Sequence, residues 1–330
     1  MPPRLRLPTP MMGMSKPFDF RMCQSYNLCL ILSTIWYKSD MGNSKILIVG
    51  VKIRHFFLIL SLNFENMTVK DILNCITEVA PLQWQESYDN AGLQVGDLNA
   101  EAHKALICLD ITEEIVDEAI AKKCDVIVSH HPLIFRGMKH LTPQTYIERA
   151  VMKAVKHDIA MISMHTNLDN SYLGVSRVLA ERLGLKNLHL LQPSVNEPEV
   201  CGSGMVGELE MPMDEVDFLR LVAFTIDSPC LRHSALTGRK ICKVALCGGS
   251  GVPFMADALR NQADAYLTAD IKYHDFFVPE GRLLLVDGGH FETEQFTKEL
   301  IYGLIRKKFP NFAAEIAETR TNAVCYFVRN

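Results

Sequence analysis

The sequence lacks several features that would assign it to a well-defined class. Its ten cysteines are scattered and form no C-x-x-C pair, so we expect them to be reduced. The net charge is only −4 and no basic run interleaves with aromatic residues, so there is no signature of nucleic-acid binding. No apolar run reaches the roughly 20 residues of a bilayer span. These absences favour a cytoplasmic protein without a membrane partner.

The first 66 residues differ from the rest of the chain. They show no regular helix or strand pattern before residues 45–64, where charged residues interrupt the apolar stretch. A regular pattern starts after Met67, with Thr68 as a helix N-cap and Asp71 three residues later. We expect residues 1–66 to be an extension outside the folded protein, either disordered or translated from a mis-assigned start, with Met67 as the true initiator.

Histidines and carboxylates recur after three short apolar runs. They are His130 and His131 after Asp125–Ser129, His165 and Asp169 after Ile159–Met164, and His290 and Glu294 after Leu283–Val286. A single histidine at a strand end is more often a hydrogen-bonded structural residue. Three clusters in equivalent positions favour metal ligation instead, because imidazole and carboxylate groups suit zinc, iron or manganese.

The spacing within the clusters predicts two metal ions. Successive side chains of an extended segment point to opposite sides, so His130 and His131 are expected to bind different ions, with a carboxylate bridging them. His290 and Glu294 open a segment to residue 308 that has a helical pattern, and residues four apart share one helix face. Both can therefore reach one centre.

The chain contains a degenerate internal repeat. Two pairs of segments are similar at one offset of 139 residues (243 − 104 and 264 − 125): Lys104–Cys108 with Lys243–Cys247, and Asp125–Ser129 with Asp264–Thr268. Helical patterns lie between the members of each half, at residues 113–123 and 253–261. Each half thus reads as strand, helix, strand, helix, strand.

This order predicts an α/β fold, internally duplicated, with three α/β/α layers and mostly parallel strands. We expect two intertwined domains, with the metal site on residues 67–192 plus 287–330 and the second domain on residues 200–286. Ligands of such sheets bind beyond the carboxyl ends of the strands, which is where the histidine clusters lie.

Five sequence blocks resemble those of one known family. They are Glu86–Gly96, Ser129–Phe135, His165–Asp169, Cys247–Gly251 and Gly288–Glu294. From about Met67 to Asn330 the chain resembles the Nif-three-like proteins, also called GTP cyclohydrolase type 2 homologues or dinuclear metal centre proteins. Residues 248–251 either offer backbone N–H groups to an anion or form only a tight turn, and we favour the turn.

The resemblance implies that five residues bind two divalent ions: His130, His131, Asp169, His290 and Glu294. In the family pattern, His131 and Asp169 serve one ion, His130 and His290 serve the other, and Glu294 bridges them. The resemblance also implies a toroidal homohexamer whose metal sites face an inner cavity.

Three further residues are candidates around this centre. His165 is expected behind the ligands, where it would orient Asp169 or contact a substrate. Asp270 and His274 are candidates for the same cavity, with solvent-exposed loop residues as the alternative.

The predicted function is that of a metal-dependent hydrolase on a small nucleotide-like or phosphoester substrate, because two ions can activate a shared water. Nothing in the sequence selects guanine. The alternative is a non-catalytic metal-binding module that regulates, interacts with or delivers metal to a partner. A hydrolase needs open coordination positions, whereas a structural ion is usually enclosed.

Overall fold

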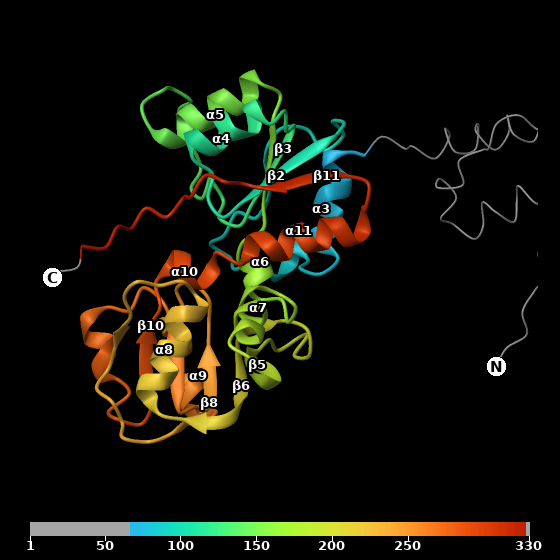
Figure 1. The fold of residues 1–330 in the computed structure, drawn as a ribbon. Helices are drawn as coiled ribbons and strands as arrows, with labels where there is room; N and C mark the ends of the chain where they lie inside the picture. Colours follow the sequence, from blue (N-terminus) through green and yellow to red (C-terminus); the bar gives the residue numbers. More distant parts are fainter. Residues whose placement is uncertain (1–66, 328–330) are drawn as a thin grey trace, which may run out of the picture. The chain divides into compact units, whose positions relative to one another are not determined.

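The computed structural model describes residues 67–327. The expectations for residues 1–66 lie outside the described part of the chain. The described residues belong to one compact unit that contains two β-sheets surrounded by helices (Figure 1). The fold is therefore mixed α/β, as the sequence predicts.

The first sheet has five strands in the order β1-β4-β3-β2-β11. Neighbouring strands are parallel except β1, which runs antiparallel to β4. The strands are β1 (Gly92–Val95), β2 (Lys104–Cys108), β3 (Val126–Ser129), β4 (Ala160–Ser163) and β11 (Ala313–Ile316). All four residues of β3 and of β4 are buried, as expected for parallel strands that are covered on both faces.

Helices pack against both faces of this sheet. Ala105 and Ile107 point to one side, toward α3 (Val69–Thr77) and α11 (Thr297–Lys308). Leu106 and Cys108 point to the other side, toward α4 (Glu113–Ala121) and α5 (Tyr146–Lys156). The predicted N-cap Thr68 is confirmed, because its side chain accepts a hydrogen bond from the first turn of α3. Thr112 caps α4 in the same way.

The second sheet has six strands in the order β5-β6-β8-β9-β10-β7. They are β5 (Lys186–Pro193), β6 (Gly202–Met213), β7 (Arg232–His233), β8 (Ile241–Leu246), β9 (Ala265–Thr268) and β10 (Leu284–Asp287). Only β8, β9 and β10 are parallel to one another. The expectation of mostly parallel strands is therefore wrong for this sheet. The connection from β5 to β6 is too short for a crossover, so these two strands pair as an antiparallel hairpin.

The second sheet also carries helices on both faces. One face packs against α7 (Val175–Arg182) and α8 (Glu215–Thr225). The other packs against η3 (Val252–Phe254) and α9 (Met255–Arg260). Because β5 pairs with β6, this strand lies in the second sheet, although the predicted boundary assigned it to the first domain. The division into domains, their intertwining and the internal duplication stay predictions.

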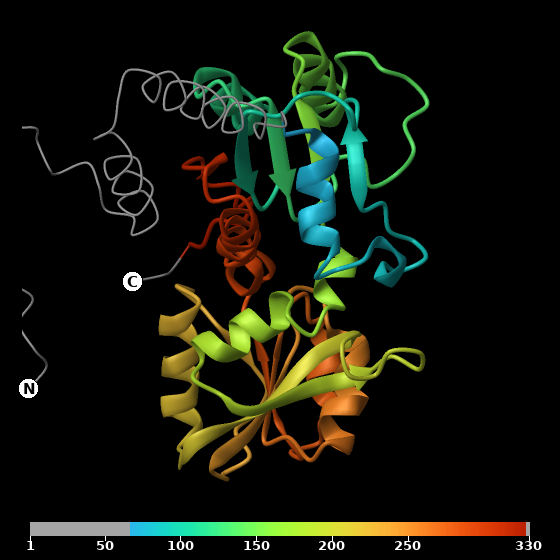
Figure 2. The ribbon, with the colours of Figure 1, turned by 90° about the vertical axis from the view of Figure 1, so that its right-hand side faces the viewer.

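Two short helices lie between the sheets. In Figures 1 and 2, α6 (Thr166–Asp169) and α10 (His290–Glu294) occupy the region between the strands of the two sheets. The predicted helix from residue 291 to 308 is divided into α10 and α11 by a turn at Gln295 and Phe296. Among residues 67–327, none of the helices combines the length and the apolar character needed to cross a bilayer.

Candidate metal centre

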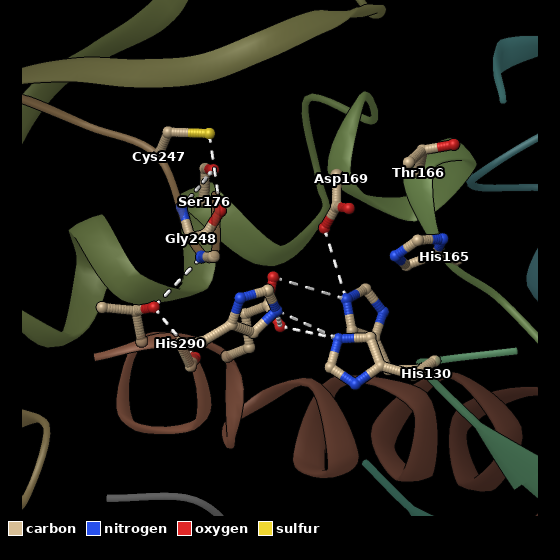
Figure 3. Close-up of polar contacts among 12 residues, drawn as sticks. His130, His165, Thr166, Asp169, Ser176, Cys247, Gly248 and His290 are labelled. Carbon is tan, nitrogen blue, oxygen red and sulfur yellow. Dashed lines mark hydrogen bonds and ion pairs between the residues drawn. The ribbon is translucent and has the colours of Figure 1, made fainter. Parts of the chain in front are cut away.

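The candidate site forms where three strands end. After β3 the chain continues as His130 and His131, after β4 it enters α6, and after β10 a turn leads into α10. In that turn Gly289 has a φ of 88°, and a Cβ atom there would lie 2.3 Å from Glu292 Oε2. The turn therefore requires glycine. The site residues of the three segments come from distant parts of the sequence and face one another (Figure 3).

The carboxylate of Glu294 lies at the centre of the cluster. Its Oε2 is 2.9 Å from His131 Nε2 and 3.0 Å from His290 Nε2. Its Oε1 is 3.8 Å from His130 Nε2, which is in turn 3.5 Å from Asp169 Oδ1. All five predicted ligands are thus brought together around one carboxylate.

These distances group the side chains differently from the family pattern inferred from the sequence. Three groups of side chains lie close enough to hold an ion: His131, His290 and Glu294; His130, Asp169 and Glu294; and His130, His131 and His165. We refer to the first two as the Oε2 side and the Oε1 side of Glu294. Distances between side chains do not assign ions, so the family partition, with His131 beside Asp169, stays a prediction. The expectation that His130 and His131 bind different ions also stays a prediction.

Each histidine is oriented through its other ring nitrogen. His131 Nδ1 lies 2.7 Å from Asp110 Oδ1, and His290 Nδ1 lies 2.7 Å from Asp270 Oδ2. His130 Nδ1 lies 2.8 Å from the carbonyl oxygen of Met164. An acceptor at Nδ1 fixes the proton there and leaves Nε2 free to bind a cation, an arrangement usual behind metal-binding histidines.

Two buried atoms on the Oε1 side have no hydrogen-bond partner. They are His130 Nε2 and Asp169 Oδ1. Their separation of 3.5 Å, with the His130 side chain fully buried, is too long for a good hydrogen bond. Buried polar atoms of folded proteins are normally satisfied by a hydrogen bond, a water molecule or an ion. A divalent cation that accepts lone pairs from nitrogen and oxygen would satisfy both atoms.

The charges of the cluster are strongly coupled to its hydrogen bonds. Burial would lower the pKa of His131, but the bonds with Asp110 and Glu294 outweigh burial and raise it to about 10. The pKa of His290 is raised to about 11 against the same effect of burial, by Asp270 and Glu294. Burial and the charge of Glu294 raise the pKa of Asp169 to about 7. Without an ion, protons therefore supply the positive charge beside Glu294.

His165 is next to the cluster but belongs to neither the Oε2 side nor the Oε1 side. Its ring centroid is 5.4 Å from that of His130 and 5.5 Å from that of His131. Its Nδ1 lies 2.7 Å from Asp89 Oδ1, so it pairs with Asp89 rather than with the Asp169 side chain. Burial opposes ionisation of Asp89, but bonds from His165 and Thr166 lower its pKa to about 2.

The remaining predicted residues have different positions. Asp270 contacts His290 and has a φ of 56°. His274 is exposed on η4 (Tyr273–Phe277), where its ring contacts the rings of Tyr273 and Phe277. In the 248–251 segment, the N–H groups of Gly248, Gly249 and Gly251 donate to Ser176, Thr293 and Thr268. These internal bonds favour the tight turn over an anion site.

A cavity of about 260 Å³ opens beside the cluster. His165, Asp169, His290 and Glu294 form part of its wall. The rest of the wall consists of Glu86, Tyr88, Thr166, Asn170, Ser203, Gly204, Cys247, Gly248, Ser250 and Phe254. Asn170 Nδ2 donates to Glu86 Oε1 at 3.0 Å, and Ser203 Oγ donates to Asn170 Oδ1 at 2.7 Å. The candidate ligands are therefore accessible to a small molecule.

Residues 67–323 match the family described as Duf34/NIF3 (NGG1p interacting factor 3). The chain belongs to the DUF34/NIF3 family. The match begins at the residue from which the sequence resemblance was inferred. It also includes every candidate ligand.

Relatives and solved structures agree with this assignment. The chain is 35% identical over 231 residues to the "GTP cyclohydrolase 1 type 2 homolog" of Clostridium perfringens, covering 69% of this chain and 87% of the relative. It is 32% identical over 232 residues to the protein of the same name in Clostridium acetobutylicum, covering 69% and 86%. The crystal structure of the Staphylococcus aureus hypothetical protein SA1388 matches 80% of this chain and 100% of its own, with 28% identity and a TM-score of 0.75.

Sequence reasoning missed two carboxylates of this DUF34/NIF3 site. Asp110 follows the end of β2 by two residues, so it occupies the same strand-end position as the histidine clusters. Asp89 lies within the block Glu86–Gly96 that resembles the family, but no spacing connects it to His165, 76 residues later. The strand-end rule was a sufficient signal for Asp110, whereas Asp89 required the folded structure.

Proposed function

We propose that this protein binds two divalent metal ions and uses them to hydrolyse a small nucleotide-like or phosphoester substrate. The observation that carries the proposal is the unpartnered pair on the Oε1 side, His130 Nε2 and Asp169 Oδ1. Both atoms are buried beside a carboxylate whose other oxygen already has two histidine neighbours. The relatives' name, "GTP cyclohydrolase 1 type 2 homolog", is consistent with a hydrolytic reaction of this kind.

The donor set fits two ions of zinc, iron or manganese. Three imidazoles and two carboxylates are ligands that these metals accept, and no thiolate takes part. On this proposal His131 and His290 hold one ion, His130 and Asp169 hold the other, and Glu294 bridges them. The cavity leaves room for water and substrate, as a catalytic site requires.

Two ions close together lower the pKa of a bound water and stabilise charge on attacking and leaving oxygens. The chain supplies the orientation of the ligands. Asp110 and Asp270 fix the rings of His131 and His290 through Nδ1, so that Nε2 of each ring faces Glu294.

His165 is the candidate general base. It lines the cavity, and Asp89 holds the proton on its Nδ1, so the lone pair of Nε2 is available to accept a proton. General base catalysis by a positioned histidine contributes about 10²- to 10⁴-fold to a rate. Replacing His165 by alanine should therefore lower kcat while both ions remain bound.

The test is turnover of bis(p-nitrophenyl) phosphate and of GTP by the full chain, after loading with zinc or manganese and again after chelation. We expect hydrolysis only in the loaded protein. Glu294→Gln should abolish it while the circular dichroism spectrum is unchanged, because the bridging charge is lost. Glu299→Gln is the matched control, since Glu299 is exposed on α11, close in sequence.

Unchanged turnover in Glu294→Gln would contradict the bridging role. Two bound ions without turnover of any phosphoester or nucleotide would favour the second candidate, a non-catalytic metal-binding or metal-delivery module. The cavity beside the ligands is the observation that favours the hydrolase.

We also propose the finer architecture that the sequence and the family suggest. It comprises two duplicated α/β/α halves in intertwined domains, assembled as a cytoplasmic homohexamer. Support for the duplication comes from three consecutive parallel strands in each sheet, β2-β3-β4 and β8-β9-β10. Native mass spectrometry of the full chain tests the assembly, and a monomer or dimer would contradict it.

A further inference from the structure

A second cavity, of about 320 Å³, lies under the segment between β3 and α5. Arg136, Lys139 and His140 line it together with apolar side chains and Glu148. Among residues 67–327, neither Arg136 nor Lys139 has a hydrogen-bond or ion-pair partner. Two unpaired cations in one concave surface are available to bind an anion.

The N-terminus of α5 adds to the positive character of this cavity. Thr145, the N-cap, and Ile147, in the first turn, are part of its wall. The positive end of the dipole of this eleven-residue helix lies at these lining residues, although Glu148 N already donates to Thr145 Oγ1. Glu148 Oε2 is already engaged, because it accepts hydrogen bonds from Thr142 Oγ1 at 2.9 Å and from Gln144 N at 3.1 Å.

The segment that carries Arg136 and Lys139 contacts the candidate metal centre through the aromatic ring of Phe135. The Phe135 ring is 6.0 Å from the His165 ring and 6.4 Å from the Tyr88 ring, measured between centroids. Tyr88 lines the cavity beside the ligands, and Phe135 lines the basic cavity. Tyr88 and Phe135 are 65% and 41% exposed, so the aromatic surface between the two cavities is available to a ligand.

The start of this segment is held in place by side chains from the Glu86–Gly96 block. Ile134 N donates to Gln94 Oε1 at 3.0 Å, and Asn90 Nδ2 donates to Ile134 O at 2.6 Å. These bonds fix the chain one residue before Phe135. The aromatic contact with His165 is therefore part of a built structure rather than of a free loop.

The charges of the two cavities are complementary to a ligand with two different ends. The wall of the metal-side cavity includes the carboxylates of Glu86, Asp169 and Glu294 but neither lysine nor arginine. Two bound ions would attract one anionic group of a substrate there. A second anionic group, further from the ions, would be repelled by the Glu86 carboxylate in this cavity. It would be attracted by Arg136 and Lys139 in the second cavity, beyond Phe135.

We propose that Arg136, Lys139 and the N-terminus of α5 form a binding site for a phosphate group of the substrate. This inference rests on the proposed hydrolase function and defines its substrate class. The substrate carries a terminal phosphate at this site, a flat or apolar middle part against Tyr88 and Phe135, and its reacting bond at the metal centre. A nucleotide has these three parts.

The test is a calorimetric titration of the chelator-treated full chain with inorganic phosphate at low salt. Wild type should bind phosphate saturably, and Arg136→Gln/Lys139→Gln should bind it about tenfold more weakly, as expected for the loss of charged hydrogen bonds. Lys156→Gln is the matched control, because Lys156 is exposed in the last turn of the same helix, away from the cavity. Added sodium chloride should weaken wild-type binding.

Equal affinities in wild type and the double variant would overturn the site, as would an equal loss in Lys156→Gln or no saturable binding by wild type. The single variant Arg136→Gln should give an intermediate loss. Metal content and turnover are measured separately on the same proteins. A chain that binds phosphate through Arg136 but holds no ions contradicts only the proposed function. A chain that holds two ions and hydrolyses phosphoesters, with phosphate binding indifferent to Arg136 and Lys139, contradicts only the phosphate site.

Discussion

The two sides of the Glu294 carboxylate differ in burial, hydrogen bonding and charge. On the Oε2 side, the side chains of His131 and His290 are 21% and 38% exposed, lie close to Glu294 and are backed by carboxylates. On the Oε1 side, His130 is fully buried, is backed by a neutral carbonyl and, among residues 67–327, has no hydrogen bond at its Nε2.

This difference indicates how the negative charge of Glu294 is balanced in the absence of a metal ion. Protons on His131 and His290 replace an ion on the Oε2 side, since their pKa values are raised to about 10 and about 11. On the Oε1 side, His130 Nε2 and Asp169 Oδ1 are 3.5 Å apart, which is too long for a good hydrogen bond through a shared proton, so we expect that side to depend more on a cation. We therefore expect the two ions to differ in their dependence on pH and on the carboxylates behind the histidines.

The largest effect should come from Asp169→Asn. The variant removes the only carboxylate that belongs to the Oε1 side alone, and it should therefore hold about one ion per chain instead of about two. The ion count is measured by elemental mass spectrometry after zinc loading. Asp158→Asn serves as the control, because Asp158 is exposed at the end of α5. Loss of both ions, or of neither, would show that the two sides are not separable.

The second-largest effect should be a difference between the Oε1 and Oε2 sides in the pH dependence of their zinc affinity. An ion on the Oε2 side displaces protons from His131 and His290, so its affinity should rise by about tenfold per pH unit for each proton displaced, which is up to about hundredfold per pH unit when both leave, between about pH 7 and about pH 9. Asp169, with a pKa of about 7, is already ionised over most of this range, so affinity on the Oε1 side should rise far less. Zinc titrations of wild type and Asp169→Asn separate the two, and identical slopes would refute the difference.

Asp110→Asn should weaken one ion without removing it. The carboxylate orients His131 and raises its basicity, and loss of such a partner typically costs about 10- to 100-fold in metal affinity. Only the Oε2 side should be affected, because Met164 O rather than a carboxylate backs His130. Competition with a chromophoric chelator measures both affinities. An equal loss of metal affinity on the two sides would contradict this role, because it would mean that Asp110 stabilises the folded protein as a whole and does not specifically orient His131.

The smallest effect concerns Asp89, which holds His165 and Thr166 beside the cluster. Its folded pKa of about 2 lies below the ordinary 3.8, so its ionisation stabilises the fold above about pH 4. That contribution, about 2 kcal/mol, is lost as the pH falls through about 2. In urea unfolding, Asp89→Asn should be less stable than wild type near neutral pH, and the gap should narrow in acid. A gap independent of pH would contradict this role.

The sequence predicted those features that depend on residues close together in the chain, and it did not predict contacts between residues far apart in the chain. Local spacing was enough for the strand ends and the N-cap of the first helix, and the family resemblance named the five residues that meet at the Glu294 carboxylate. The approach of α10 to β3 is a tertiary contact that no spacing encodes, so the distances among these residues required the folded structure. The position of β5 in the second sheet follows from its hairpin with β6. Asp89 was missed because its partner is distant in sequence.

The central claim is that Glu294 bridges two divalent ions, one per side. Anomalous diffraction at the zinc absorption edge, from crystals of the zinc-loaded full chain, tests it most directly. The account predicts two peaks that flank the Glu294 carboxylate, one bound by His131 and His290 and the other by His130 and Asp169. A single peak, no peak, or an ion shared by His131 and Asp169 would contradict it.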